Sequence, residues 1–302
     1  MPAVNSPRIL LSGVSGPIGA ALMPSLMALG YQITRLVRGP ASGETQISWD
    51  PLKPLAPESV SGFEAVIHLA GESIVGRWTE DKKKRIRESR VEGTRNLSEA
   101  LAKARSRPRV LITASAIGYY GDRGDELLRE ESPPGQGFLP EVCRQWEAST
   151  EPATQAWIRT VHMRTGLVLS RDGGALQKML LPFRLGLGGN IGNGRQWWSW
   201  IDVQDWVGAL HHIMKTELLQ GPVNLVAPRP VINAEFTKTL ATVLSRPAIF
   251  PMPALAARLV FGQMADELLL ASQRVEPTKL VASGYPFQYS DLSKSLQAIL
   301  AH

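Results

Sequence analysis

Cysteine is almost absent from this chain of 302 residues, which contains only Cys143. A single cysteine excludes a disulfide within the chain and fits a reducing compartment. Long apolar runs are lacking too, since no stretch approaches the roughly 20 residues that cross a membrane as a helix. The first seven residues, M-P-A-V-N-S-P, lack the basic segment and apolar core of a signal peptide. We therefore expect a cytoplasmic protein with no membrane partner.

Acidic residues are missing from a long N-terminal stretch, because no Asp or Glu lies between Gly13 and Glu44. The whole chain has a formal net charge of +6, which suits anionic small ligands but is too diffuse to identify one. The densest basic run, residues 82–87, is expected to be a solvated helix face rather than a nucleic-acid site. We therefore expect a small-molecule substrate and no nucleic acid.

Glycine is what the N-terminal segment has in abundance. Residues 8–21 read R-I-L-L-S-G-V-S-G-P-I-G-A-A, the strand, tight turn and helix of a dinucleotide-binding unit. We expect Gly13 to take a turn conformation and Gly16 to let the backbone approach a pyrophosphate. Gly19 is expected to let the helix pack close to the strand. The helix N-terminus, with Pro17 in its first turn, then offers free N–H groups to the phosphates.

Arginine stands where many such proteins carry an acid. The second predicted strand, residues 31–37, runs into T-R-L-V-R-G-P. A preference for NAD usually shows as an acidic residue there, which hydrogen-bonds the ribose 2′-hydroxyl. This chain offers Arg35 and Arg38 instead, and a guanidinium suits a 2′-phosphate. Strand alternation puts Arg35 and Val37 on one face, so Arg38 at the strand end is the better candidate. The sequence therefore predicts NADP(H) rather than NAD(H).

The later segments predict an α/β protein with a Rossmann-like, doubly wound parallel sheet. Pro24 falls inside the first predicted helix and is expected to kink or shorten it. Further strands are predicted at residues 47–50, 64–70, 109–113 and 160–170. Further helices are predicted at residues 81–104, 139–150 and 175–185.

Two later segments have a different character. A glycine cluster at residues 186–194 does not follow a strand, so we expect a loop that lines a cleft and no second nucleotide site. Beyond residue 250, a mostly helical stretch over 254–271 and a terminal helix from Asp291 predict a small C-terminal substrate or cap lobe.

A group of tryptophans either lines a substrate pocket or packs the junction of two domains. These are Trp197, Trp198, Trp200 and Trp206.

Four segments carry a family resemblance: the opening glycines, V-I-H-L-A-G, S-A-I-G-Y-Y-G and W-I-D-V-Q-D-W. In them the chain resembles the short-chain dehydrogenase/reductase superfamily, in its extended or atypical branch of nucleotide-sugar epimerase-like proteins. A narrower resemblance rests on R-W-T-E-D-K-K-K-R-I-R-E-S-R, L-L-P-F-R-L-G-L-G-G, G-R-Q-W-W-S-W-I-D, N-L-V-A-P and the tail from P-M-P-A-L-A-A-R onward. It is to a subfamily named epimerase family protein or NADP-dependent oxidoreductase, some of whose members have been labelled cell-division inhibitors.

The resemblance implies an NAD(P)-binding epimerase-like domain over residues 7–225, with substrate-lobe insertions from about residue 171. It implies a small C-terminal lobe over residues 249–298. It also implies NADP(H) across the glycine turn, with Val37 and Arg38 at the 2′-phosphate end and Val168 near the nicotinamide. The other implied contacts come from the turn, the 64–70 strand and the long helix: Gly13, Ser15, Gly16, Pro17, Ile18, Leu69, Ala70, Gly71, Arg85 and Arg90.

The chain departs from the superfamily at the catalytic positions. Active members use a Tyr-x-x-x-Lys pair on the helix that here starts near Leu139. The lysine lowers the tyrosine pKa, so that the phenol passes a proton while hydride moves. Alignment on Glu147 puts Leu139 at the tyrosine position and Cys143 at the lysine position, and neither side chain can do that work. The usual proton relay is therefore absent or has moved.

Side chains that could replace the missing tyrosine and lysine follow the predicted strand at 109–113. Alignment of the Tyr-Gly pair puts the usual Ser/Thr position at Ala116, one residue after Ser115. We predict that Ser115 orients the substrate and that Tyr119 or Tyr120 serves as the acid; the alternative is that both rings only pack or line the pocket. The leading functional hypothesis is an NADP(H)-dependent oxidoreductase or epimerase-like enzyme of unknown substrate. The alternative is a non-catalytic NADP(H)-binding protein whose conformation a partner protein senses.

Other reactive side chains are assigned no catalytic role. Glu147 is expected to be an exposed helix residue, and Cys143 would be a nucleophile only if its pKa were lowered. His211 and His212 lie in a helical stretch without ligand partners, so no metal site is predicted. The sequence leaves the oligomeric state open, with a homodimer as one option.

Overall fold

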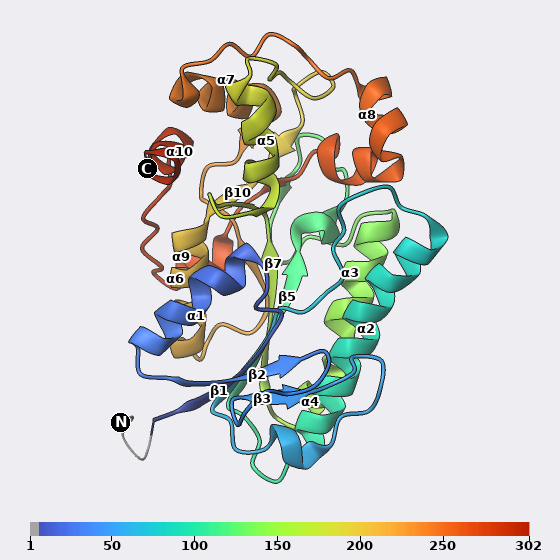
Figure 1. Cartoon of the computed structure of the whole chain (residues 1–302), viewed down its shortest axis with the longest axis vertical. Helices are drawn as coiled ribbons and strands as arrows, with labels where there is room; N and C mark the ends of the chain where they lie inside the picture. Colours follow the sequence, from blue (N-terminus) through green and yellow to red (C-terminus); the bar gives the residue numbers. More distant parts are fainter. Residues whose placement is uncertain (1–5, 302) are drawn as a thin grey trace.

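The computed structural model describes residues 6–301; residues 1–5, on which most of the signal-peptide prediction rests, lie outside the described residues. A seven-stranded sheet forms its centre, and all neighbouring strands in it are parallel (Figure 1). Its strands lie in the order β11 (Gly221–Leu225), β7 (Arg159–Thr165), β5 (Val110–Ala116), β4 (Ala65–His68), β1 (Arg8–Ser12), β2 (Gln32–Val37) and β3 (Gln46–Ser48). The strand order reverses between β1 and β4, so the predicted Rossmann-like sheet is confirmed. Ligands bind such sheets at the carboxyl ends of the strands beside this reversal.

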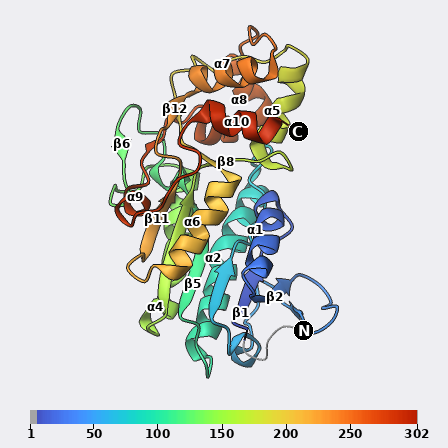
Figure 2. The same cartoon turned by 90° about the vertical axis from the view of Figure 1, so that its left-hand side faces the viewer.

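Helices cover both faces of the sheet (Figures 1 and 2). One face carries α1 (Pro17–Ala28), α6 (Val203–Lys215) and α9 (Thr278–Ala282). The other carries α2 (Glu80–Lys103), α3 (Phe138–Ala148), α4 (Glu151–Gln155) and the 3₁₀ helix η1 (Pro57–Val60). Because both faces are covered, the central strands β1, β4 and β5 contain continuous apolar runs, at residues 9–11, 65–67 and 110–112, rather than alternating apolar and polar residues.

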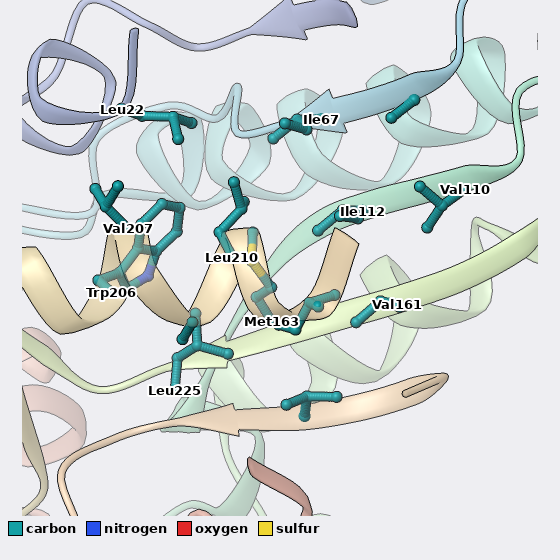
Figure 3. Close-up of a cluster of buried hydrophobic side chains, with 14 of the residues drawn as sticks. Leu22, Ile67, Val110, Ile112, Val161, Met163, Trp206, Val207, Leu210 and Leu225 are labelled. Atoms are coloured by element: carbon teal, nitrogen blue, oxygen red, sulfur yellow. The ribbon is translucent and has the colours of Figure 1, made fainter. Parts of the chain in front are cut away.

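An apolar core joins α6 to the sheet (Figure 3). Trp206 and Leu210 project from α6 toward Ile112 of β5 and Met163 of β7, and all four side chains are buried. The indole Nε1 of Trp206 donates a hydrogen bond to Thr165 Oγ1 at 3.1 Å, so burial leaves this polar atom satisfied. Trp206 therefore belongs to the core of the sheet domain.

Of the two expected effects of Pro24, a kink or a shorter helix, the second does not occur, because α1 continues through Pro24 to Ala28. A proline inside a helix removes one backbone hydrogen bond, here the bond to the carbonyl of Ala20. Both Pro24 and Ala20 lie on the exposed side of α1, where water can bond that carbonyl. Leu22 and Leu26 hold the buried side of the helix against the sheet.

The predicted strand over residues 160–170 is in fact two strands. β7 ends at Thr165, and β8 (Leu167–Leu169) leaves the main sheet to pair with β10 (Trp200–Asp202). Gly166 marks the break, because a Cβ there would lie 2.5 Å from the carbonyl oxygen of Ser199. This close contact between two backbones is a tertiary feature that the apolar pattern of the strand does not reveal.

A second group of helices lies beyond the carboxyl edge of the sheet, in the upper part of Figure 1. α5 (Gly174–Arg184), α7 (Asn233–Leu244) and α10 (Leu292–Leu300) share one apolar cluster with β8 and β10. The expected helical stretch over 254–271 is interrupted at Gly262, between α8 (Ala254–Phe261) and the π-helical turn η3 (Ala265–Leu269). The remaining elements are short: η2 (Ile117–Tyr120), β6 (Leu127–Leu128), β9 (Trp197–Trp198), β12 (Val231–Ile232) and β13 (Arg274–Val275).

Candidate functional site

The turn after β1 lies against the end of β4. Gly13 has a φ of +76°, in the left-handed region that favours glycine. A Cβ built on Gly13 would lie 2.4 Å from the backbone nitrogen of Ala70 and from the carbonyl carbon of Leu69. Only glycine permits this approach, so the turn and the segment after β4 border the same part of the crevice.

The other two glycines have contrasting surroundings. Gly16 is the N-cap of α1 and Pro17 its first residue; within the described part of the chain, no atom lies within 4 Å of a Cβ built on Gly16. A Cβ on Gly19 would instead lie 2.4 Å from the Cα and the carbonyl oxygen of Val14. Gly19 therefore allows the helix to pack on the turn, whereas Gly16 leaves open space at a helix N-terminus, where an anion is favoured.

Basic side chains gather around the carboxylate of Glu72, which follows β4. Lys82 Nζ lies 2.6 Å from Glu72 Oε1, and Arg85 Nε lies 4.0 Å from the same oxygen. The hydrogen bond from Lys82 lowers the pKa of the Glu72 carboxyl, and burial opposes this shift. Further lowering of this pKa comes from the charges of Lys82, Arg85 and Arg38. The predicted arginines of β2 and α2 therefore act on one small region beside the glycine turn.

Arg90 fixes the backbone after β4. Its Nη1 donates to the carbonyl of Glu72 at 2.9 Å, and its guanidinium lies 5.0 Å from the ring centroid of Trp146. A Cβ on Gly71 would lie 3.1 Å from the guanidinium carbon of Arg90. The structure thus places Arg90 beside the predicted cofactor edge, but with its donors directed at backbone carbonyls.

A buried ion pair lies behind the carboxyl end of β5. Arg164 donates from Nε and Nη2 to the two oxygens of Glu147, both at 2.8 Å, and Ser115 Oγ donates to Glu147 Oε1 at 2.7 Å. The Glu147 side chain is only 12% exposed, so the expectation of an exposed helix residue is wrong. Burial alone would lower the pKa of Arg164, but its bonds to Glu147 raise it, so the guanidinium stays charged.

The two tyrosines after β5 lie in different environments. Tyr120 is fully buried; its hydroxyl donates to Asn224 Oδ1 at 2.7 Å and accepts from Arg164 Nη1 at 3.0 Å. Burial raises the pKa of Tyr120 to about 12, although Arg164 acts in the opposite direction. Tyr119 is half-buried, and its ring centroid lies 3.5 Å from the Arg164 guanidinium carbon. Of the two tyrosines, only Tyr119 keeps partial access to solvent.

The positions of the usual Tyr and Lys are filled by apolar packing. Leu139 and Cys143 lie on α3 and are 5% and 3% exposed. Burial and the charge of Glu147 raise the pKa of the Cys143 thiol to about 12, against the opposing effect of Arg90. A thiol with so high a pKa is no nucleophile at neutral pH, so the condition set for Cys143 is not met.

The remaining predicted contacts are spread along the same edge. Ser15 is exposed in the glycine turn, and Ile18 packs partly against the sheet core from α1. Val37 is half-buried at the end of β2. Val168 is half-buried in β8, opposite Ile201 of β10. The structure thus brings the turn, the segment after β4 and the end of β2 together, with Val168 on a separate two-stranded sheet.

Most of the tryptophan group packs the interior. Trp198 and Trp200 are 8% and 0% exposed in the cluster of α5, α7 and α10, and Trp206 is 1% exposed in the sheet core, so burial removes all three as pocket walls. Trp197 is half-buried; its Nε1 donates to Asp125 Oδ1 at 2.8 Å, and Arg274 lies over its ring. Only Trp197 remains a candidate for lining a pocket.

One residue of the loop over 186–194 borders a hollow on the surface. This residue, Asn190, lines a cavity of about 470 Å³ together with residues of α7, away from the glycine turn. Within residues 6–301, no group of three or more His, Cys, Asp or Glu side chains is arranged to hold a metal ion. None of the helices in that range is long and apolar enough to cross a membrane.

This geometry agrees with the comparisons with known proteins. Residues 9–225 match the NAD dependent epimerase/dehydratase family, and residues 252–299 match a domain of unknown function, DUF1731. The chain belongs to the NAD dependent epimerase/dehydratase family. The superfamily resemblance seen in the sequence is thereby confirmed, together with its C-terminal domain.

Relatives within the epimerase family cover almost the whole chain. Epimerase family protein MT2273 of Mycobacterium tuberculosis is 39% identical over 290 residues, which are 95% of this chain and 96% of that protein. The crystal structure of human epimerase family protein SDR39U1 (isoform 2) with NADPH is 36% identical, with a TM-score of 0.90, over 97% of this chain and 99% of that one. A nucleoside-diphosphate sugar epimerase from Corynebacterium glutamicum is also 36% identical, with a TM-score of 0.82; the match includes 98% of this chain and 58% of that one.

Several residues of this epimerase-family site were not identified from the sequence. Glu147 and Arg164 are 17 positions apart and belong to α3 and β7, so no local pattern pairs them. Lys82 lies in the segment R-W-T-E-D-K, which carried the resemblance without being assigned a role, and Glu72 directly follows the segment V-I-H-L-A-G. An acidic residue directly after Gly71, within reach of a basic helix, was the available signal for Glu72.

Proposed function

We propose that this epimerase-family chain binds NADP(H) across the β1–α1 turn. The observation that carries the proposal is the pairing of open backbone at Gly16 with the cationic region formed by Arg38, Lys82 and Arg85. The first suits a pyrophosphate and the second a 2′-phosphate. The human relative solved with NADPH supports the same assignment.

We further propose an oxidoreductase or epimerase-like reaction on a small substrate. When bound, the nicotinamide supplies hydride transfer. Ser115 would hold the reacting oxygen of the substrate, because its own hydroxyl proton is directed to Glu147 and its lone pairs are left to accept. As an alcohol is oxidised, its proton would pass to the Ser115 hydroxyl while the proton of that hydroxyl passes to the Glu147 side chain, which Arg164 holds; the reverse direction returns both protons. Tyr119, whose ring lies over the Arg164 guanidinium, would line the substrate pocket beside Ser115.

The experiment has two arms. The first compares binding of NADPH and NADH by calorimetry, and we expect NADPH to bind more tightly. The second mixes the protein and NADPH with a panel of carbonyl compounds and sugar nucleotides, and follows nicotinamide absorbance and isomer formation. A turnover that falls in Ser115→Ala while NADPH still binds supports the relay; no turnover with any substrate removes the enzymatic part of the proposal.

A second candidate function is a non-catalytic NADP(H)-binding protein that a partner senses. The packing of Leu139 and Cys143 at the usual Tyr and Lys positions favours it. Its test is a partner pull-down with and without NADPH. Identical partner sets in the two conditions count against a cofactor-dependent interaction.

A further inference from the structure

The carboxylate of Glu72 lies where an anionic ligand group would be expected. Its Oε1 is 2.6 Å from Lys82 Nζ and 4.0 Å from Arg85 Nε, and the charge of Arg38 also acts on it. These three cations come from α2 and from the end of β2, the elements that flank the adenosine side of the crevice in this fold. A single internal carboxylate thus neutralises part of a site whose net charge is otherwise positive.

The main chain of Glu72 is held by two hydrogen bonds, and its side chain is partly exposed beside Lys82. The backbone N–H of Glu72 donates to Ser89 Oγ at 2.9 Å, and its carbonyl accepts from Arg90 Nη1 at 2.9 Å. The side chain of Glu72 is 29% exposed, whereas that of Lys82 is 15% exposed. Of the two partners, Glu72 therefore has the greater access to solvent.

We propose that the Glu72 carboxylate is an internal competitor of the cofactor 2′-phosphate and that it sets the selectivity between NADP(H) and NAD(H). This inference rests on the proposed binding of NADP(H) to the β1–α1 turn. A phosphate dianion beside a carboxylate is repelled, so the phosphate takes the cations only when Glu72 turns away. NAD(H) carries a 2′-hydroxyl instead, which can donate a hydrogen bond to a carboxylate. Glu72 therefore weakens the binding of NADP(H) and does not weaken the binding of NAD(H).

The decisive variant is Glu72→Gln, which removes the charge and keeps the shape. We expect NADPH to bind about fivefold more tightly, the effect of one screened like charge at short range. NADH binding is expected to be unchanged or weaker. The fragments adenosine 2′,5′-bisphosphate and 5′-AMP repeat the comparison without the nicotinamide half, and only the first is expected to gain affinity.

The matched control is Glu80→Gln. Glu80 lies on α2, the helix of Lys82 and Arg85, is 90% exposed and pairs with Lys83 at 3.0 Å, so this change alters the net charge equally outside the site. Thermal melting of both variants checks folding. The control is expected to bind all four ligands as the wild type does.

Each outcome decides the inference. Selective tightening of the 2′-phosphorylated ligands in Glu72→Gln supports it. Weaker NADPH binding in that variant would mean that Glu72 positions the cations instead, and an equal gain for NADPH and NADH would reflect a general charge effect; either overturns it. Wild-type protein that binds neither cofactor refutes the proposed function itself, and the inference falls with it.

Discussion

Individual glycines in the β1–α1 turn differ in what surrounds them, although their spacing makes them look equivalent. Gly13 and Gly19 each meet backbone atoms at 2.4 Å, whereas Gly16 meets open space among the described residues. The first two are therefore required by the fold, and the third is required only by a ligand that approaches the backbone.

This contrast predicts opposite results for two alanine variants. Gly16→Ala should melt like the wild type but lose about tenfold or more in NADPH affinity, because the methyl group occupies the space of a pyrophosphate. Gly19→Ala should lose roughly 1–3 kcal/mol of unfolding free energy, because the helix must move away from Val14. Differential scanning fluorimetry and calorimetry measure both. An unstable Gly16→Ala variant, or one with unchanged affinity, would contradict this assignment.

At the level of elements, the N-terminus of α3 is completed by a residue from the C-terminal region. The N-cap Gly137 has no side chain to offer. Glu267, in the π-helical turn η3, accepts hydrogen bonds from the backbone N–H groups of Phe138 and Leu139 at 3.1 and 2.7 Å. A helix that carries Cys143 and Glu147 is thus fixed by a segment more than 100 residues away, and a carboxylate suits its dipole.

Glu267→Gln is expected to lower the unfolding free energy by about 1 kcal/mol, because the amide can accept only one of the two bonds. Urea denaturation measures this change. Glu141→Gln is the control: it removes a carboxylate from the first turn of the same helix, but this carboxylate is half-exposed and pairs with Arg144. The control should lose only a few tenths of a kcal/mol, roughly. Equal losses would argue against a specific cap.

At the scale of the whole molecule, the C-terminal region is built into several cores rather than attached to one. Met264 lies in the cluster around α2 and α3, and Val275 packs with Tyr120. Leu280 joins the core of the sheet, and Leu296 the cluster of α5 and α7. Folding of the site and of the C-terminal region is therefore expected to be one cooperative event.

Global stability should also depend on pH through a buried histidine. Burial lowers the pKa of His68 to about 4 in the folded chain, from an ordinary value of 6.5. Between these values the unfolded chain binds the extra proton and the folded chain does not. The stability contributed by the neutral His68 is therefore complete above about pH 6.5 and is lost as the pH falls toward about 4.

The variant His68→Asn tests this dependence, because its amide can replace the Nδ1 contact with Ser12 Oγ, at 2.6 Å, without titrating. The wild type should lose about 2 kcal/mol from this one group between roughly pH 7 and 5. The variant should be less stable at neutral pH but lack that part of the pH dependence. Parallel stability curves for the two proteins would contradict the assignment.

The sequence by itself determined the features that depend on local periodicity and on backbone sterics. An apolar strand, the glycine turn and the basic end of β2 are each encoded by a few consecutive residues. They were therefore sufficient to predict the parallel sheet, the place of the crevice and the 2′-phosphate candidate Arg38. Domain boundaries and cofactor contacts remain predictions. The same local rules did not decide whether α1 ends at Pro24, because that depends on which face of α1 is exposed.

Only the tertiary structure decided what the polar side chains do, because their partners come from distant elements. Glu147 has an ordinary helical sequence around it, and the buried Arg164 of β7 alone makes it part of the site. Tyr119 and Tyr120 are neighbours in the chain, yet Asn224 and Arg164 bury the second hydroxyl. Charges and hydrogen bonds act through space, so long-range packing assigns the chemistry that sequence patterns leave open.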